Sequence, residues 1–354
     1  MTLVIGILEG DDIGLEVVPE CVKVMKAAAG KARLAVDWRH VPIARRAHEQ
    51  YGHTLPPGTL ETLEALHGWI LGPIGHREYP RNDPTWVNAH PVLRTHFQFY
   101  ANYKPFKSYA NIPSLHKNVD MLFLRETTEG FKVDANLYQG YGEFQPTADM
   151  AIGICVTTRE KSRLIAQSAF EAARARPRKK VSAVHKNTVY RMGDGLFAEE
   201  CRKVAAHFPD VEFEEVIVDT CALRLVMAPQ QYDVLVTTNL YGDILTDEAA
   251  GLVGGLGLAP GLNAGARHAM AQATHGSAPD IAGRNIANPY AMIMSGKMLY
   301  EWLAHKHDEP KAAAAARLID RAVEQVIAEA KHLTRDLGGT ASTAGMGDAI
   351  AAAI

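Results

Sequence analysis

The sequence has no apolar run that approaches the roughly 18 residues of a membrane-spanning helix. No basic segment precedes its first apolar run, at residues 3–8, as a secretory leader would require. From these two absences we expect a cytoplasmic protein that does not cross a membrane.

Cysteine and clustered basic charge are also scarce. The four cysteines, Cys21, Cys155, Cys201 and Cys221, contain no Cys-x-x-Cys pair, which excludes a disulfide framework and a structural zinc site, and we expect four buried thiols. The longest basic cluster is Arg176, Arg178, Lys179 and Lys180, in a chain of net charge -3. Such a cluster is too short for a nucleic-acid surface and predicts a solvated loop.

What the chain does contain is an alternation typical of α/β proteins. Short apolar runs at residues 69–74, 121–125, 181–185 and 234–238 alternate with longer segments rich in alanine and glutamate. The length of 354 residues exceeds one ordinary core and predicts either two lobes or one large α/β unit. Near the end, Ile319, Val323, Val326, Ile327 and Ala330 share one face of an expected packing helix.

The strongest local pattern is acidic. Asp243 and Asp247 follow the apolar run 234–238 and stand four residues apart, so both carboxylates share a face if a helix has its first turn here, after a break at Gly242. Asp219 ends another apolar run, and carboxylate oxygens suit Mg²⁺ or Mn²⁺. The alternative is that acidic residues simply favour a helix N-terminus.

Basic residues supply a second pattern. Arg94, Lys104 and Arg125 stand in separate segments and together could hold a small polyacid, although scattered cations are commonly surface residues. Lys186 directly follows the run 181–185 and could act as a general base if its surroundings favoured the neutral amine; otherwise it is a surface lysine.

Of two glycine-containing segments, only the first supports a ligand-binding loop. The segment HGSAPDIAG at 275–283 predicts a loop whose backbone amides can approach a ligand closely. The segment GDGLFA at 193–198 fits the dinucleotide pattern by letter, but the preceding apolar run ends several residues earlier, so we discount it.

Taken together, these segments resemble, over essentially the whole chain, the isocitrate/isopropylmalate dehydrogenase family of β-decarboxylating dehydrogenases. The motifs that carry the resemblance are GDDIGLE at 10–16, LR at 93–94, NYKP at 102–105, RETTEG at 125–130, KN at 186–187, Asp219, NLYGDILTD at 239–247, HGSAPD at 275–280 and NP at 288–289. The resemblance implies a two-domain αβα fold distinct from a Rossmann domain. Residues 1–98 and 252–354 would form the cofactor-binding domain, and residues 99–251 the dimerisation and metal/substrate domain.

The resemblance further implies NAD-dependent, metal-dependent oxidative decarboxylation of a (2R)-hydroxy acid of the malate type. In that scheme Asp219, Asp243 and Asp247 hold Mg²⁺ or Mn²⁺, Lys186 takes the hydroxyl proton, and Arg94, Lys104 and Arg125 bind the substrate. It also implies a homodimer whose active site takes Lys186 and Asp219 from one subunit and the other residues from its partner.

For the cofactor, the resemblance assigns seven residues to the adenosine side of the site: His275, Gly276, Ser277, Ala278, Asp280, Ile281 and Asn288. Asp280 and Ile281 replace the Lys-Tyr pair of NADP-using relatives, and a carboxylate there would accept from the ribose hydroxyls and repel a 2′-phosphate. We therefore predict NAD.

Three departures from the family pattern concern the substrate. Lys104 replaces the usual arginine and cannot make a two-pronged carboxylate contact. Lys132 stands where the family places the tyrosine that protonates the enol, so either Lys132, Tyr138 or Tyr141 donates that proton, or the step is slow. Asn88 and His90 replace apolar contacts of the 3-isopropylmalate enzymes, which favours tartrate, D-malate or isocitrate-like substrates.

Two other functions remain open from the sequence. One is a metal-dependent decarboxylase without a redox step, against which Asp280 argues. The other is a non-catalytic homologue, against which the three aspartates and Lys186 argue.

Overall fold

The computed structural model describes residues 1–132, 136, 137 and 139–354, and the chain divides into two compact units. Unit 1 comprises Met1–Phe97, Tyr109–Pro113 and Gly254–Ile354, and unit 2 comprises Gln98–Ser108 and Ser114–Val253. Each unit combines a largely parallel sheet with helices, which confirms the α/β class. The domain limits and roles inferred from the sequence stay predictions.

Unit 1 contains five strands in the order β2-β1-β3-β12-β11. Only β11 and β12 pair in antiparallel fashion. The strands are β1 (Leu3–Leu8), β2 (Val36–His40), β3 (Gly68–Leu71), β11 (Leu262–Ala264) and β12 (Ala269–Ala271). The helices are α1 (Gly14–Ala32), α2 (Ala44–Tyr51), α3 (Thr59–Glu64), α4 (Ala89–His96), α9 (Tyr290–His307), α10 (Pro310–Glu329) and α11 (Thr343–Ala352). Three 3₁₀ turns complete the unit, at His76–Glu78, Leu256–Leu258 and Arg335–Leu337.

Local sequence explains two limits in unit 1. The packing helix expected near the end is confirmed as α10, whose Ile319, Val323, Val326 and Ile327 are buried. Ala330, expected on the same face, is instead the exposed C-cap of this helix. Pro310 opens α10, since the first turn needs no backbone donor there. The apolar run 69–74 is strand only as far as Leu71, because it reaches Pro73, which has no N–H for a ladder.

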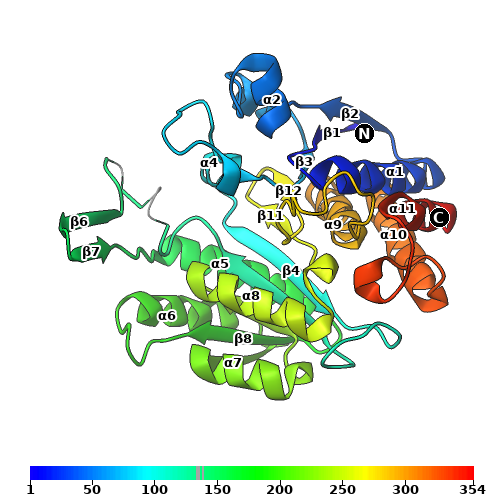
Figure 1. Ribbon diagram of the computed structural model, residues 1–354. Coiled ribbons are helices and arrows are strands. Elements are labelled where there is room, and N and C mark those ends of the chain that lie inside the picture. The colour runs from blue at the N-terminus through cyan, green and yellow to red at the C-terminus, as the bar shows by residue number, and fades with distance from the viewer. Residues whose placement is uncertain (133–135, 138) are drawn as a thin grey trace. The chain divides into compact units, whose positions relative to one another are not determined.

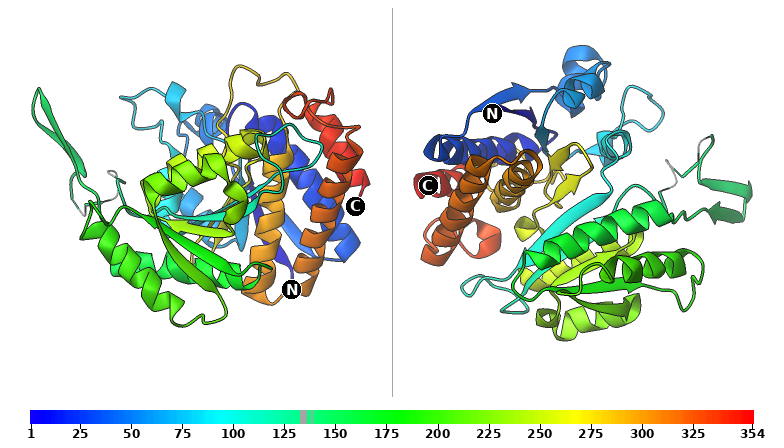
Figure 2. Two further views of the ribbon diagram at one scale, coloured as in Figure 1. Left: turned by 90° about the horizontal axis from the view of Figure 1, so that it is seen from below. Right: turned by 180° about the vertical axis from the view of Figure 1, so that it is seen from behind.

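Among the described residues of unit 2, the main sheet has five strands in the order β4-β5-β10-β8-β9, of which all but β4 run parallel. The strands are β4 (Ala101–Lys107), β5 (Asp120–Glu126), β8 (Lys180–His185), β9 (Glu212–Ile217) and β10 (Val234–Thr237). The helices are α5 (Arg159–Arg174), α6 (Gly193–Ala205), α7 (Val218–Met227) and α8 (Asn239–Val253), with a 3₁₀ turn at Pro229–Gln231. Figure 1 shows α8 in front of the strands, and the view from behind in Figure 2 shows α5 on the other side.

The register of the parallel strands aligns their carboxyl ends. Thr237 of β10 pairs with Arg125 of β5 and with Val184 of β8, and His185 pairs with Ile217 of β9. The segments that follow these strands therefore emerge along one edge of the sheet. That edge is where open α/β sheets place their sites.

A two-stranded hairpin, β6 (Glu143–Thr147) and β7 (Met150–Gly153), extends from unit 2 (Figures 1 and 2). All of its residues are exposed, including Phe144, Met150 and Ile152. An isolated hairpin is at best marginally stable in water, so these exposed apolar side chains indicate a surface that needs a partner.

Two expectations from composition are wrong in part. Cys155 is exposed, whereas Cys21, Cys201 and Cys221 are buried free thiols. The basic cluster is not a solvated loop: Arg176 donates from Nε to Asp233 at 2.6 Å and from Nη2 to Asp120 at 2.8 Å, and Asp233 is buried. Among the described residues, no helix is both long enough and apolar enough to span a membrane.

Candidate active site

The carboxyl edge of the unit 2 sheet gathers polar side chains from four strands. Arg125 lies at the end of β5, α8 starts two residues after β10, Lys186 follows β8, and Asp219 lies in α7 directly after β9. These segments lie far apart in the sequence, and the parallel register brings them to one edge.

Arg125 is the centre of a hydrogen-bonded network at this edge. Its guanidinium donates to Asn239 Oδ1 from Nε at 3.1 Å and from Nη2 at 2.6 Å, and Nη1 forms an ion pair with Asp243. Asn239 in turn donates from Nδ2 to the carbonyl of Glu129 at 2.8 Å. Burial lowers the pKa of Arg125, and the nearby Asp243 opposes that shift. The sequence did not single out Asn239, yet it joins Arg125 to the backbone of the RETTEG segment.

Gly242 makes room for this arginine. A Cβ at position 242 would lie 2.6 Å from Cγ and 2.8 Å from Cβ of Arg125, closer than real Cβ atoms come. The expectation that Gly242 breaks the chain is wrong, because it lies inside α8. Its missing side chain instead lets α8 pack closely against the end of β5.

Asp243 and Asp247 lie one turn apart on α8, as their spacing predicts. They are not in the first turn, which starts at Asn239 and contains no acidic residue. This corrects the expected helix start and removes the alternative of acidic residues stabilising a helix N-terminus. Both aspartates are exposed. Between them, Thr246 accepts from the buried Lys104 Nζ at 2.9 Å.

Lys186 and Asp219 form an ion pair with Nζ and Oδ1 2.5 Å apart. Asp219 lies in the first turn of α7 rather than at a strand end, which corrects the sequence interpretation. The hydrogen bond from Lys186 lowers the pKa of Asp219.

Asp194, which the sequence analysis passed over, holds the backbone of Lys186. Its Oδ2 accepts from the Lys186 N–H at 2.5 Å, and Asp194 is buried in the first turn of α6. The GDGLFA segment that we discounted as a dinucleotide motif therefore supplies a positioning residue. An acidic residue in the first turn of the helix that follows Lys186 is the signal that would have found it.

Asp219, Asp243 and Asp247 do not meet within one chain. Across residues 1–132, 136, 137 and 139–354, no three His, Cys, Asp or Glu residues lie close enough to hold a metal ion. Their oxygen donors fit Mg²⁺ or Mn²⁺ chemically, and all three aspartates are exposed. The described residues of one chain therefore do not assemble a three-carboxylate site from these aspartates.

Glu129 is a buried acid beside this network. Thr158 donates to it from its backbone N at 2.9 Å and from Oγ1 at 2.8 Å. Burial nevertheless raises the pKa of Glu129 to about 7. The fold therefore favours the protonated carboxyl, and the stability that this contributes is present at low pH and lost as the pH rises from about 4.5 to about 7.

We expect Glu129→Gln to flatten this dependence, since a glutamine amide can donate to Thr158 Oγ1 and carries no titrating proton. Urea unfolding at pH 5, 6, 7 and 8 measures it: the wild type should lose stability relative to the variant as the pH rises. Parallel curves for the two proteins would contradict the assignment. Glu171, an exposed glutamate on α5, supplies the matched control Glu171→Gln.

The position of the family tyrosine lies in a partly described loop. Lys132 is partly buried and directly precedes residues 133–135, which lie outside the described residues, as does Tyr138. Tyr141 is 71% exposed. The choice between Lys132, Tyr138 and Tyr141 as proton donor stays open.

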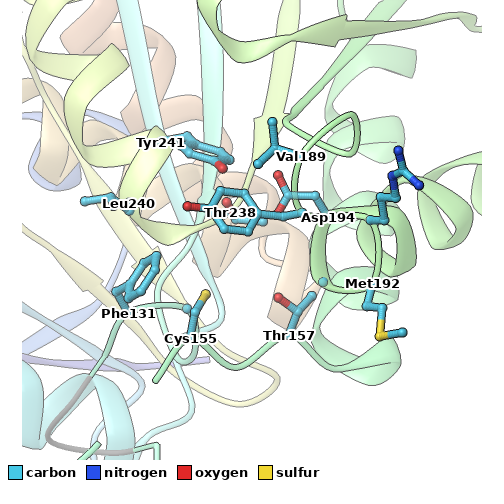
Figure 3. Close-up of a pocket in the computed structure, with 13 residues that line it drawn as sticks. Phe131, Cys155, Thr157, Val189, Met192, Asp194, Thr238, Leu240 and Tyr241 are labelled. Atoms are coloured by element: carbon cyan, nitrogen blue, oxygen red, sulfur yellow. The ribbon is translucent and has the colours of Figure 1, made fainter. Parts of the chain in front are cut away.

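A cavity of about 420 Å³ lies beside this edge and is drawn in Figure 3. Its lining includes Asp194, Tyr241, Met192, Phe131 and Cys155, and none of the site residues predicted from the sequence. Burial and the neighbouring Asp194 raise the pKa of Tyr241. Since Asp194 also holds Lys186, the cavity and the Lys186 backbone share one wall residue.

In unit 1, α4 and its N-cap carry the predicted substrate residues Asn88, His90 and Arg94. Asn88 is the N-cap of α4, with Oδ1 accepting from the His90 backbone N at 3.1 Å. His90 Nε2 lies 2.7 Å from Nε2 of Gln272, and Gln272 Oε1 accepts from Asn263 Nδ2 at 3.1 Å. Burial first, then Arg94 and His76, lower the pKa of His90 to about 3, so its ring is neutral at physiological pH.

A second cavity, of about 600 Å³, lies in unit 1. It brings together five of the seven residues predicted to bind the cofactor: His275, Gly276, Ala278, Ile281 and Asn288. Ser277 and Asp280 are not in its lining, although both belong to the same loop. The other lining residues are Ile13, Leu256, Gly257, Arg284, Ile286, Ala287, Arg335 and Asp336.

Polar side chains shape this second cavity. Asn288 donates from Nδ2 to Asp336 Oδ2 at 2.9 Å, and a Cβ on Gly257 would come within 2.5 Å of the same oxygen. Nε2 of His275 is buried without a hydrogen-bond partner among the described residues, and burial lowers the pKa of this ring. A neutral imidazole with an unused nitrogen in the cavity wall suits a heterocyclic ligand.

Known proteins resemble this chain in sequence and in fold. The family model described as isocitrate/isopropylmalate dehydrogenase matches residues 4–350. The chain belongs to this family.

The relatives are similar along nearly their whole length. The isocitrate/homoisocitrate dehydrogenase of Thermus thermophilus is 38% identical over 350 residues, covering 99% of this chain and 98% of that protein. The probable isocitrate dehydrogenase [NAD] subunit alpha, mitochondrial, of Drosophila melanogaster is 37% identical over 345 residues, covering 95% of this chain and 84% of that protein. The crystal structure of isocitrate dehydrogenase from Methylococcus capsulatus superimposes with a TM-score of 0.86 at 38% identity, covering 99% of both chains.

These findings confirm the isocitrate/isopropylmalate dehydrogenase fold inferred from the motifs. The chain is an oxidoreductase of the isocitrate/isopropylmalate dehydrogenase type.

Proposed function

We propose that the protein catalyses the NAD-dependent, metal-dependent oxidative decarboxylation of a (2R)-hydroxy acid of the malate type. The observation that carries the proposal is the arrangement at the carboxyl edge of unit 2, where the Arg125–Asn239–Asp243 network and the Lys186–Asp219 pair emerge from neighbouring strands. Each subunit thus presents a fixed guanidinium for a carboxylate, an amine for proton transfer and carboxylate oxygens for a cation, which the shared sites of a dimer would combine.

Asp219, Asp243 and Asp247 would hold Mg²⁺ or Mn²⁺, which when bound lowers the pKa of a substrate hydroxyl and stabilises an enolate. The chain's own residues do the rest. Arg94 and Arg125 bind the substrate carboxylates, and the Lys104 ammonium adds a point charge beside Thr246.

Lys186 takes the proton from the C2 hydroxyl as the C2–H bond breaks and its hydride passes to NAD. The bond between C3 and the β-carboxylate then breaks, releasing carbon dioxide and leaving its electron pair in an enolate. A proton delivered to C3 by Lys132 or by a loop tyrosine completes the product. Asp194 fixes the Lys186 backbone, so that the amine can reach the hydroxyl from one direction.

We place the adenosine part of NAD in the cavity of about 600 Å³, with Asp280, from the loop that contributes Ala278 and Ile281 to the lining, as the acceptor for the ribose hydroxyls. Arg284 and Arg335 also line this cavity, and among the described residues neither has an acidic partner. Two such guanidinium groups suit the cofactor diphosphate. Because they would also attract a 2′-phosphate, Asp280 is the group that opposes NADP binding.

Replacing Asp280 by lysine should therefore shift the preference from NAD towards NADP. We expect the ratio of kcat/KM for NAD to that for NADP to fall about 10- to 100-fold, since an acceptor for the ribose is lost and a cation for the phosphate is gained. Initial rates with both cofactors measure it. Asp308, an aspartate at the end of α9, gives the control Asp308→Lys. An unchanged ratio in Asp280→Lys would contradict the role of Asp280.

We also propose a homodimer with shared active sites. Exposed apolar residues form a face on α7, with Leu223, Val226 and Met227, and continue on α8 with Leu240 and Ile244. The exposed hairpin adds Phe144, Met150 and Ile152. Asp219 and Asp243 lie on these same two helices, so pairing of α7 and α8 with a second copy would supply the missing carboxylate.

The test is NADH formation at 340 nm with Mn²⁺ or Mg²⁺, with NAD and NADP compared. The acids are D-malate, tartrate, isocitrate, homoisocitrate and 3-isopropylmalate. We expect one acid to reduce NAD, to require the metal and to release carbon dioxide. Carbon dioxide release from a 2-oxo acid without NAD reduction would favour a metal-dependent decarboxylase. No NADH formation with any of the five acids, despite NAD binding, would favour a non-catalytic homologue.

A further inference from the structure

The side chains packed against His90 form a chain of amides within unit 1. Asn263 lies in β11 and Gln272 directly follows β12, and both are buried. The backbone N of Gln272 donates to the carbonyl of Gly261 at 3.0 Å, which fixes the start of its side chain. Asn263 Nδ2 then donates to Gln272 Oε1 at 3.1 Å, so the other end of that amide, Nε2, faces His90 at 2.7 Å.

With the Asn263 and Gln272 amides oriented as in this structure, the contact sets which ring nitrogen of His90 carries the proton. An amide nitrogen only donates, so the His90 Nε2 that receives it must be unprotonated. A neutral imidazole has one N–H, and it is then at Nδ1. His90 stays neutral across the working pH range because burial, Arg94 and His76 lower the pKa of its ring.

His90 and Arg94 stand four residues apart on α4, and therefore on one face of this helix. Nδ1 of His90 makes no hydrogen bond with any described residue. A fixed neutral donor thus lies beside the arginine assigned to a substrate carboxylate. A hydrogen-bond donor left without an acceptor rejects an alkyl group far more strongly than an apolar pocket rejects a hydroxyl.

We propose that Gln272 is a positioning residue that holds His90 as an Nδ1–H donor, and that the substrate is a 2-hydroxy acid whose C3 substituent carries an oxygen acceptor, a hydroxyl or a carboxylate. The inference rests on the proposed function for the site, but the tautomer of His90 does not. The preference for an oxygen-bearing substituent then has a structural cause outside the substrate site, in β11 and the residue after β12.

The first experiment is ¹H–¹⁵N NMR of histidine-labelled protein without substrate, with His90 assigned from the His90→Phe spectrum. We expect Nε2 to resonate as an unprotonated ring nitrogen and Nδ1 to be protonated from pH 6 to pH 8. The opposite tautomer, in which Gln272 accepts from Nε2–H, would overturn the proposal whether or not the protein turns over any acid.

The second experiment compares kcat/KM for tartrate or isocitrate with that for 3-isopropylmalate. The wild type should favour the oxygen-bearing acid, and Gln272→Met should reduce that ratio about tenfold, as loss of one oriented hydrogen bond would. Gln272→Glu should place a carboxylate on Nε2, move the proton there and add an ionisation to the pH profile of kcat/KM between about pH 5 and pH 8. Gln231→Met, at an exposed glutamine of unit 2, is the matched control.

The outcomes separate the two proposals. If no acid reduces NAD while the tautomer is as expected, the proposed function fails and the positioning role of Gln272 stands. If acids are oxidised but 3-isopropylmalate is preferred, or Gln272→Met leaves the ratio unchanged in a folded enzyme, this inference fails and the proposed function stands. Thermal unfolding of each variant identifies those that have merely lost stability.

Discussion

Mixing two inactive variants, Lys186→Met and Asp247→Asn, should restore about one quarter of the wild-type activity. Each variant alone should lose about 10²- to 10⁴-fold in kcat, since one lacks the proton acceptor and the other a carboxylate for the cation. If each active site takes Lys186 from one subunit and Asp247 from its partner, a hybrid dimer has one site with both changes and one with neither. Random exchange makes about half of the dimers hybrid, and half of their sites are intact.

The experiment requires subunit exchange, by mild denaturation of the mixture or by co-expression with two different tags. The matched control pairs Lys186→Met with Asp219→Asn, two changes at residues that form one ion pair in the same chain. That mixture should stay inactive, because every site of its hybrid dimer carries one of the changes. Recovery in the control, or none in the test mixture, would contradict sharing in the proposed sense.

The site residues at the edge of the unit 2 sheet could be predicted from the sequence because they directly follow short apolar runs. Arg125 is the penultimate residue of β5 and Lys186 follows β8, and parallel strands align such ends whatever the rest of the chain does. The spacing of Asp243 and Asp247 on α8 followed for a similarly local reason, since helical periodicity needs no knowledge of packing.

Contacts between residues far apart in the sequence could not be predicted in this way. Asn239 accepts a hydrogen bond from Arg125, which lies 114 residues earlier in the chain, and Gln272 contacts His90 across a separation of 182 residues. Gly242 was read as a chain break because glycine usually is one, whereas its function here is to admit the Arg125 side chain beneath α8. Arg176 was read as solvated because its buried partner, Asp233, precedes a different strand.

Replacing Arg125 by lysine should lower kcat/KM by about 10²-fold or more although the positive charge is kept. A lysine cannot contact Asn239 from two nitrogens and Asp243 from a third at once, as the guanidinium does. We therefore expect two separable losses: weaker binding of the substrate carboxylate, and weaker binding of Mn²⁺ because Asp243 is no longer held in place.

Steady-state kinetics measures the first loss, and Mn²⁺ titration by calorimetry or electron paramagnetic resonance measures the second without any turnover. Arg176→Lys is the control, because Arg176 also makes ion pairs with two aspartates in unit 2 but has no assigned role in binding. It should reduce thermal stability and leave kcat/KM and the Mn²⁺ affinity of the folded protein unchanged. Equal Mn²⁺ affinity in Arg125→Lys and the wild type would contradict a role for Arg125 in holding Asp243 for the metal. The guanidinium would then act on the substrate alone.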